Sequence, residues 1–368
     1  MAHGVFFESL NAAGAPITIQ TTRVVGLAAP VPAGATGFSI GDFKVIRGPT
    51  DVQALGLAPT DDLQYQLDGL FAQARAPVIL FGTDPGADQA ALETNLAGSA
   101  SLNTGVYKFK EAQQTFGFKP KVVIAPGQSA ATVHAALVGC CEAIRAVTIL
   151  DGPDTDDAAA IAAAGAISDG EGRSTMSDPW HVNGAVTLAP SASIAGIYAK
   201  TDWWRSPSNK TINGITGTTR AIFHELTNDA DEAQALNDAN IMTTVQNQGF
   251  RTWGNRNLSA SGYALPFISD VIADDVIREA LAQAHLFWVD QPLTRKTFAD
   301  NLLRSLNAFF DKQVALDRLV GAEATLDPDI NTAATLEAGQ IYINYEVTYA
   351  SPAENITFRR AVTNRFYE

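Results

Sequence analysis

The sequence is short of positive charge. It contains 25 lysine and arginine residues against 39 aspartate and glutamate residues, a formal net charge of −14, and its pI is near 4.7. A protein that binds nucleic acid needs a basic surface to neutralise phosphate groups. We therefore expect no nucleic-acid partner.

Long apolar runs are also missing. No stretch approaches the roughly 20 apolar residues of a membrane-spanning helix, so no membrane partner is predicted. The opening residues MAHGVFFESLN have no basic stretch followed by a long apolar core. A secretion signal is therefore not expected.

Cysteine and histidine are scarce. The two cysteines, Cys140 and Cys141, are adjacent in a stretch with a helical pattern. Neighbouring side chains on a helix point about 100° apart, which suits neither a disulfide nor a CxxC metal site. They are interpreted as small buried side chains in a reducing compartment. The five histidines are scattered without HxxxH or HExxH spacing, so we predict no metal and no cofactor.

Charged residues of both signs make up only 17% of the chain, below the roughly 25% of an average soluble domain. A surface with so little charge is typical of a protein that is buried in an assembly. An alanine-rich α/β core would give the same composition, so both interpretations stay open at this point.

The chain divides into four segments by pattern. Residues 1–40 hold short β-branched pieces, PITIQTTRVVGL above all, separated by Gly and Pro. They are predicted to form an extended N-terminal arm with a hinge at 26–37. We expect an α/β domain over 41–205, a C-terminal α+β domain over 206–352, and a strand-forming C-terminal arm over 353–368.

The α/β prediction depends on four continuous apolar runs that are rich in β-branched residues. They are FKVIRG (43–48), PVILFG (77–82), KVVIAPG (121–127) and AVTILDG (146–152). Such runs indicate strands that are buried on both faces. Helical patterns lie between them, and this alternation predicts a parallel, doubly wound sheet.

The C-terminal domain has a different pattern. Two amphipathic helices are predicted over 270–292 and 294–320, followed by a strand within 339–350. Alternate residues of that strand, Ile341, Ile343, Tyr345 and Val347, share one face, which indicates a half-buried antiparallel strand.

Motifs for chemistry are weak. FGTDPGADQ and LDGPDTDD follow predicted strands, but neither has the glycine spacing of a phosphate-binding loop. GRSTMSDPW (172–180) resembles the serine box of subtilisin-like proteases. However, Thr175 follows Ser174 where that box has Met, and no His box precedes it. A serine hydrolase of subtilisin-like fold and a small-molecule-binding α/β protein stay as alternative functions.

A more specific resemblance covers the C-terminal half and the beginning of the chain. RSPSNKTINGITG (205–217), LNDANIMTTV (236–245) and GFRTWGNRNLS (249–259) are followed by AHLFWVDQPLT, LEAGQIYINYEVTYA and SPAENITF. In this order they resemble the tail sheath proteins of contractile bacteriophages and R-type tailocins. GVFFESLN and PITIQTTRVVGLAAP resemble the opening arm of the same family.

This resemblance implies a structural subunit that is not an enzyme. Its α/β domain would be subtilisin-like without a catalytic triad. Copies would polymerise around a tail tube protein in a metastable extended state and contract to drive the tube through the host envelope. Baseplate and tail terminator proteins would be further partners. The subunit would be assembled in the host cytoplasm and would then belong to the virion.

The resemblance also assigns residues to interactions between subunits, because the arms of this family add strands to sheets in neighbouring copies. The implied arm residues are Ile17, Ile19, Val24, Val25, Ile356, Phe358, Arg359 and Arg360. The receiving strand is the one with Ile341, Ile343, Tyr345 and Val347. Arg295, Lys296, Arg304 and Lys312 are expected to face an acidic groove of the tube protein. The alternative is an ordinary solvated helix.

The stretch QNQGFRTWGNRNLSA (246–260) has no acidic residue. We predict that it is a structural seam of the C-terminal domain rather than a catalytic site. Trp253 would anchor the packing between the two domains, and Gly254 would permit a turn. Asn255 and Arg256 would bond to backbone carbonyls around that turn.

Overall fold

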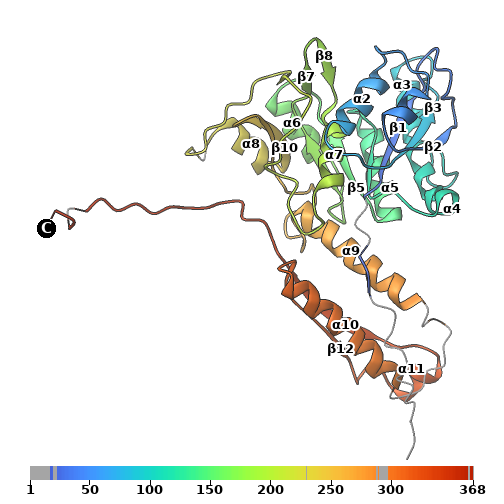
Figure 1. Cartoon of the computed structure of the whole chain (residues 1–368), viewed down its shortest axis with the longest axis vertical. Helices are drawn as coiled ribbons and strands as arrows, with labels where there is room; N and C mark the ends of the chain where they lie inside the picture. Colours follow the sequence, from blue (N-terminus) through green and yellow to red (C-terminus); the bar gives the residue numbers. More distant parts are fainter. Residues whose placement is uncertain are drawn as a thin grey trace, which may run out of the picture.

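The computed structural model describes residues 17–19, 23–228, 230–286, 289, 297–363 and 365–367, without the side chains of 297–300. Figure 1 shows a large α/β domain and a smaller unit, whose first helix leads away from the domain. The C-terminal segment leaves the smaller unit and runs away from both bodies (Figure 1).

The α/β domain is built on an eight-stranded sheet of order β11-β10-β6-β5-β4-β1-β3-β2. Its strands are β1 (Val25–Pro30), β2 (Phe43–Ile46), β3 (Val78–Thr83), β4 (Val122–Ile124), β5 (Val147–Asp151), β6 (Ser174–Ser177), β10 (Ile241–Gln246) and β11 (Phe250–Trp253). The six central strands are parallel, and β2 and β11 are antiparallel at the two edges. The predicted parallel sheet is therefore confirmed.

Helices cover both faces of this sheet. One face packs against α3 (Gln89–Ala97), η1 (Gly105–Glu111), α4 (Ala112–Phe116), α5 (Ala131–Ile144), α6 (Asp157–Gly165) and α8 (Glu232–Asp238). The other packs against α1 (Pro49–Gln53), α2 (Asp62–Phe71), α7 (Pro190–Lys200) and the start of α9 (Ile268–His285). A small sheet is formed by β7 (His181–Asn183), β8 (Val186–Leu188) and β9 (Gly217–Thr218).

The smaller unit, here called the C-terminal unit, begins with α9. It contains α10 (Thr297–Ala315), β12 (Leu319–Leu326), α11 (Ala333–Glu337) and β13 (Ile343–Tyr349). β12 and β13 form an antiparallel pair. Leu306 and Phe310 of α10 are buried against this pair in a separate apolar cluster, which also includes Ile277 of α9.

Within the described residues, three ion pairs fasten α9 to the α/β domain: Arg145–Asp275, Arg173–Asp275 and Lys121–Glu279. The Arg173 guanidinium donates to both carboxylate oxygens of Asp275, at 2.5 and 3.1 Å. Arg173 is 3% exposed, so this is a buried pair. Lys121 Nζ lies 2.5 Å from a carboxylate oxygen of Glu279, one helical turn further along α9.

The first strand of the domain corrects the predicted N-terminal boundary. Val25 begins β1, which lies between β3 and β4, and Val24 is buried in the core of its own domain. Neither residue can be part of an arm that pairs with a neighbour, and the first part of the predicted hinge at 26–37 is this strand. The sequence analysis missed the strand because VGLAAP has little β-branched character. Its small residues allow close packing, since a Cβ on Gly26 would lie 3.0 Å from Phe109 Cε1.

The C-terminal boundary also differs from the prediction. β10 and β11, expected in a domain over 206–352, belong to the eight-stranded sheet, so the α/β domain continues to the start of α9. β2, predicted as a strand buried on both faces, is a half-exposed antiparallel edge strand. β12 was not predicted, because its sequence LVGAEATL lacks a run of β-branched residues.

The position of β1 gives a testable prediction about stability. Leu27 is fully buried on β1, inside the sheet between β4 and β3. Leu27→Ala should lower the free energy of unfolding by about 2–5 kcal/mol, because it leaves a cavity in a close-packed core. Leu102→Ala is the matched control, since Leu102 is 74% exposed. Denaturant unfolding of both variants would show equal stabilities if β1 were a detachable arm.

Candidate functional site

The seam loop, residues 253–256, lies at the edge of the α/β sheet. β10 and β11 form a hairpin in which Thr243 is opposite Trp253. The loop that follows turns toward α9. Gly254 has φ +127°, and a Cβ there would lie 2.5 Å from Asn237 Oδ1. The turn therefore requires glycine at this position.

The segment of residues 207–212 runs beside β11. Asn209 N donates to the Thr252 carbonyl at 2.6 Å, and Thr252 N donates to the Lys210 carbonyl at 3.0 Å. Ser208 Oγ accepts from Gly254 N at 3.0 Å, so the same segment also supports the turn. Two motifs that are about 40 residues apart in the sequence, SPSNKTI and GFRTWGN, thus form one edge structure.

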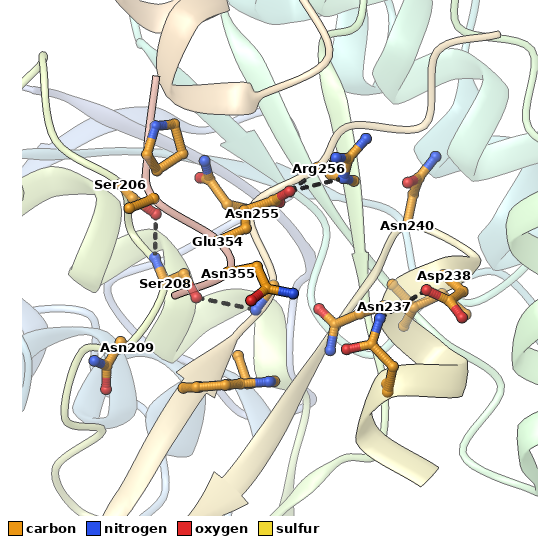
Figure 2. Close-up of a pocket in the computed structure, with 16 residues that line it drawn as sticks. Ser206, Ser208, Asn209, Asn237, Asp238, Asn240, Asn255, Arg256, Glu354 and Asn355 are labelled. Atoms are coloured by element: carbon orange, nitrogen blue, oxygen red, sulfur yellow. Dashed lines mark hydrogen bonds and ion pairs between the residues drawn. The ribbon is translucent and has the colours of Figure 1, made fainter. Parts of the chain in front are cut away.

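The exit segment, residues 350–355, crosses this edge. Arg256 holds it through one carboxylate oxygen of Glu354, with Nη2 at 2.8 Å and Nε at 3.2 Å, as Figure 2 shows. The guanidinium also lies over the Phe267 ring, 5.2 Å from its centroid. The same guanidinium therefore contacts the Phe267 ring and donates to the carboxylate of the C-terminal segment.

Further polar contacts tie the exit segment to α9. Ser351 Oγ donates to Asp270 at 3.2 Å, and the Tyr349 hydroxyl donates to Asp274 at 2.8 Å. Asp270 also accepts from Ser269, whose hydroxyl accepts from Asn255 Nδ2. Burial raises the pKa of Asp270, and the bonds from Ser351 and Ser269 act against this rise. Seam loop, α9 and exit segment therefore share one hydrogen-bond network.

The seam loop, the exit segment, residues 206–209 and α8 with the residues after it line a polar cavity of about 540 Å³ (Figure 2). It is lined by Ser206, Ser208, Asn209, Gln234, Asn237, Asp238, Asn240, Ile241, Trp253, Gly254, Asn255, Arg256, Pro352, Ala353, Glu354 and Asn355. Amides and hydroxyls dominate this lining, and it contains neither His, Cys nor Lys. Such groups donate and accept hydrogen bonds, so the site can hold and orient a polypeptide segment.

The structure changes three of the roles predicted for the seam loop. Trp253 packs on His224, with ring centroids 4.8 Å apart, so its aromatic partner belongs to its own domain. Asn255 donates to a hydroxyl, and Arg256 binds a carboxylate, so neither bonds to a backbone carbonyl. The loop also belongs to the α/β domain. The sequence analysis missed Glu354 as a partner of Arg256, although both are in quoted motifs.

The other predicted residues that the structure describes do not line this cavity. Ile17 and Ile19 are half-buried against the apolar cluster of the C-terminal unit. Ile343, Tyr345 and Val347 of β13 are half-buried against the same cluster. Ile341 lies just before β13 and also packs there. The arm residues Ile356, Phe358, Arg359 and Arg360 are exposed.

On α10, Arg304 and Lys312 are exposed, as the apolar periodicity predicts. Arg295 and Lys296 lie outside the described residues.

The serine of the predicted box does not form a catalytic triad in the described part of the chain. Ser174 is buried, and its hydroxyl donates to Asp169 at 2.7 Å, not to a histidine. A Ser–His pair does exist between Ser193 and His181, at 2.9 Å. The other ring nitrogen of His181 faces Thr244 instead of a carboxylate, and burial lowers the pKa of His181 to about 4. The pair is closed off from substrate, because both residues are buried.

Within the described ranges, no group of three or more His, Cys, Asp or Glu side chains could hold a metal ion. No helix there is both long and apolar enough to cross a membrane. Cys140 and Cys141 are free and buried, and burial raises the pKa of Cys140 to about 12. The two thiols are therefore protonated at neutral pH and unreactive.

Comparison with known proteins identifies the family. The phage tail sheath protein central domain matches residues 98–258. A prophage major tail sheath protein of Pseudomonas aeruginosa (strain UCBPP-PA14) is 31% identical over 99% of this chain and 97% of its own length. The tail sheath protein of Escherichia phage P2 is 27% identical over 99% of this chain and 96% of its own.

Solved structures agree on the fold. The sheath of the extracellular contractile injection system PVC, in its contracted state, has a TM-score of 0.75 at 16% identity, covering 100% of this chain and 99% of its own. The contracted helical sheath of the anti-feeding prophage has a TM-score of 0.74 at 18% identity, covering 97% and 98%. This chain belongs to the contractile phage tail sheath family and is a structural sheath subunit. Neither alternative function is supported.

The contact between Arg256 and Glu354 gives a prediction. Glu354→Arg should release the exit segment, because two guanidinium groups then repel each other. Hydrogen–deuterium exchange of residues 350–355 should become faster. Overall stability should change by only about 0–1 kcal/mol, since the pair is half-exposed.

The double variant Arg256→Glu/Glu354→Arg should restore slow exchange. Glu337→Arg is the matched control, because Glu337 is an exposed carboxylate away from the seam loop. Exchange rates in Glu354→Arg that equal those of the control would show that the ion pair does not hold the segment.

Proposed function

We propose that this subunit polymerises into a helical sheath whose copies are linked through their terminal segments. The observation that carries this proposal is that, among the described residues, the chain after the exit segment is unpaired and exposes apolar side chains. Residues 356–363 have no strand partner among the described residues, and Ile356, Phe358 and Val362 are 70%, 90% and 91% exposed. Apolar side chains exposed in this way are typical of a surface that a partner covers.

The pair β12–β13 offers a place for such a segment. It is a two-stranded sheet within the described part of the chain, so its outer edges present unpaired backbone groups. Ile343, Tyr345 and Val347 already pack toward the apolar cluster of the same unit. A strand added beside β13 would gain backbone hydrogen bonds and would place its alternate side chains, Ile356 and Phe358 of another copy, on the same face.

We also propose a link through the N-terminal segment, with fewer residues than the sequence analysis assigned to it. Ile17 and Ile19 remain candidates for it, whereas Val24 and Val25 do not. The α/β domain is proposed to be subtilisin-like, which its parallel sheet with helices on both faces supports.

The assembled form follows from the family. We propose a sheath that is stored extended around a tail tube protein and contracts, with baseplate and tail terminator proteins at its ends. It would be a part of the virion, assembled in the host cytoplasm. Only contacts that differ between the two lattices can drive the change. The two bodies would move nearly rigidly, and bending would fall on the segments that link the copies.

The link through the C-terminal segment is tested by one pair of variants. Phe358→Asp should abolish the formation of tubes or polysheaths by the purified chain, because it places a charge on the face that a neighbour's apolar cluster would cover. Thr357→Asp is the matched control, since neighbouring residues of a strand point to opposite faces. Sedimentation and negative-stain microscopy are the measurements. Tubes of normal yield from Phe358→Asp would contradict the proposal.

A second proposal concerns the tube. Arg304 and Lys312 project from α10, away from its buried face, and we propose that they contact an acidic groove of the tube protein. Arg304→Glu/Lys312→Glu should leave the monomer folded, lower assembly on purified tubes, and make the remaining assembly less sensitive to salt. Assembly and salt response like those of the wild type would show an ordinary solvated helix.

A further inference from the structure

A second cavity, of about 230 Å³, lies between the α/β domain and the C-terminal unit. Arg23, Lys121 and Arg145, which line it, stand at the amino ends of β1, β4 and β5. Further walls come from the end of α7 with residues 201–204, from α9, and from Arg318, which precedes β12. The cavity therefore has groups from both bodies around it.

Positive charge gathers in this cavity, although the chain as a whole carries a net charge of −14. Five cationic residues line it: Arg23, Lys121, Arg145, Lys200 and Arg318. The lining includes only two carboxylates, Asp202 and Asp275. Asp275 is already bound by Arg173 through both of its oxygens.

Three of the cations lack a carboxylate partner. Lys121 pairs with Glu279 and Arg145 with Asp275, whereas Arg23, Lys200 and Arg318 form no ion pair within the part of the chain that the structure describes. Arg318 lies over the Trp204 ring, 4.3 Å from its centroid. Burial, together with the charge of Lys210, lowers the pKa of Lys200, as expected for a cation without a counter-charge.

Two buried donors in the lining are also unsatisfied. Arg23 is 8% exposed and donates through Nη1 to the Tyr198 carbonyl, but Nη2 has no hydrogen-bond partner. Trp203 is 4% exposed, and its indole Nε1 has no partner either. Native proteins rarely leave buried donors unpaired, so each such group needs an explanation. Burial lowers the pKa of Arg23 to about 10, and the nearby charge of Asp202 acts against this lowering.

We propose that this cavity binds a small oxyanion, and that Arg23, Trp203 and Arg318 are its donors. Guanidinium groups match the two oxygens of a phosphate or carboxylate group, and the indole N–H supplies a third donor. The volume is below the roughly 300 Å³ at which pockets for larger organic ligands begin. The occupant would be inorganic phosphate or the carboxylate of an Asp or Glu side chain from a second copy. It would join the α/β domain to the C-terminal unit.

Isothermal titration of inorganic phosphate into the purified full chain tests the site. The wild type should bind one phosphate per chain with a saturable signal. Trp203→Phe, which removes only the N–H donor, and Arg318→Gln should each weaken binding about tenfold. Arg47→Gln is the matched control, because Arg47 is exposed and does not line the cavity. Near-UV circular dichroism checks that the variants are folded.

The proposal would be overturned if the wild type, both cavity variants and Arg47→Gln all gave the same heats without saturation. Such heats would show a nonspecific effect of phosphate, which acts on all four proteins alike. A second measurement separates the two sources. If a neighbour's carboxylate is the occupant, phosphate should compete with it and slow self-association in sedimentation experiments. Phosphate that binds without slowing self-association identifies a free anion as the occupant.

Discussion

The position of the C-terminal unit on the α/β domain depends on the buried ion pair between Arg173 and Asp275. Arg173 stands beside β6 in the α/β domain, and Asp275 lies on α9, the helix from which the C-terminal unit is built. Removing one partner of a buried pair leaves an uncompensated charge, which costs about 3–5 kcal/mol. Because α9 also carries Asp270 and Asp274, the same pair sets where the exit segment is held. The position of the C-terminal segment thus follows from a contact inside the domain interface.

Much of the α/β fold could be predicted from the sequence, because parallel strands that are buried on both faces have continuous apolar sequences. β3, β4 and β5 were predicted on this signal. β1 was not, although it lies inside the sheet between β4 and β3, because its sequence VGLAAP is rich in small residues and Phe109 approaches Gly26 too closely for a larger one. Composition therefore indicated a hinge at a place where packing demands small residues. A flexible hinge and a closely packed strand can have the same small residues, and only the neighbours of these residues in the structure tell the two apart.

The candidate site could be predicted only in part. The unusual composition of GFRTWGN pointed to the seam loop, and φ at Gly254 explains its glycine. Partners that are distant in the chain could not be derived, since Glu354 is 98 residues from Arg256. The residues that line the second cavity, between the α/β domain and the C-terminal unit, could not be derived from the sequence either. Arg23, Trp203 and Arg318 are unremarkable in the sequence, and they meet only because the amino ends of parallel strands face the C-terminal unit.

The fastening of the exit segment determines how the subunit carries tension. A pull on the C-terminal segment reaches the Arg256–Glu354 contact first and then the bonds of Ser351 and Tyr349 to α9. The first contact passes the load to the edge of the eight-stranded sheet, and the others pass it to a helix clamped to that sheet by Arg173. The large domain therefore bears the strain. The two-stranded sheet, which has the smaller core, is shielded from the force transmitted along its own chain.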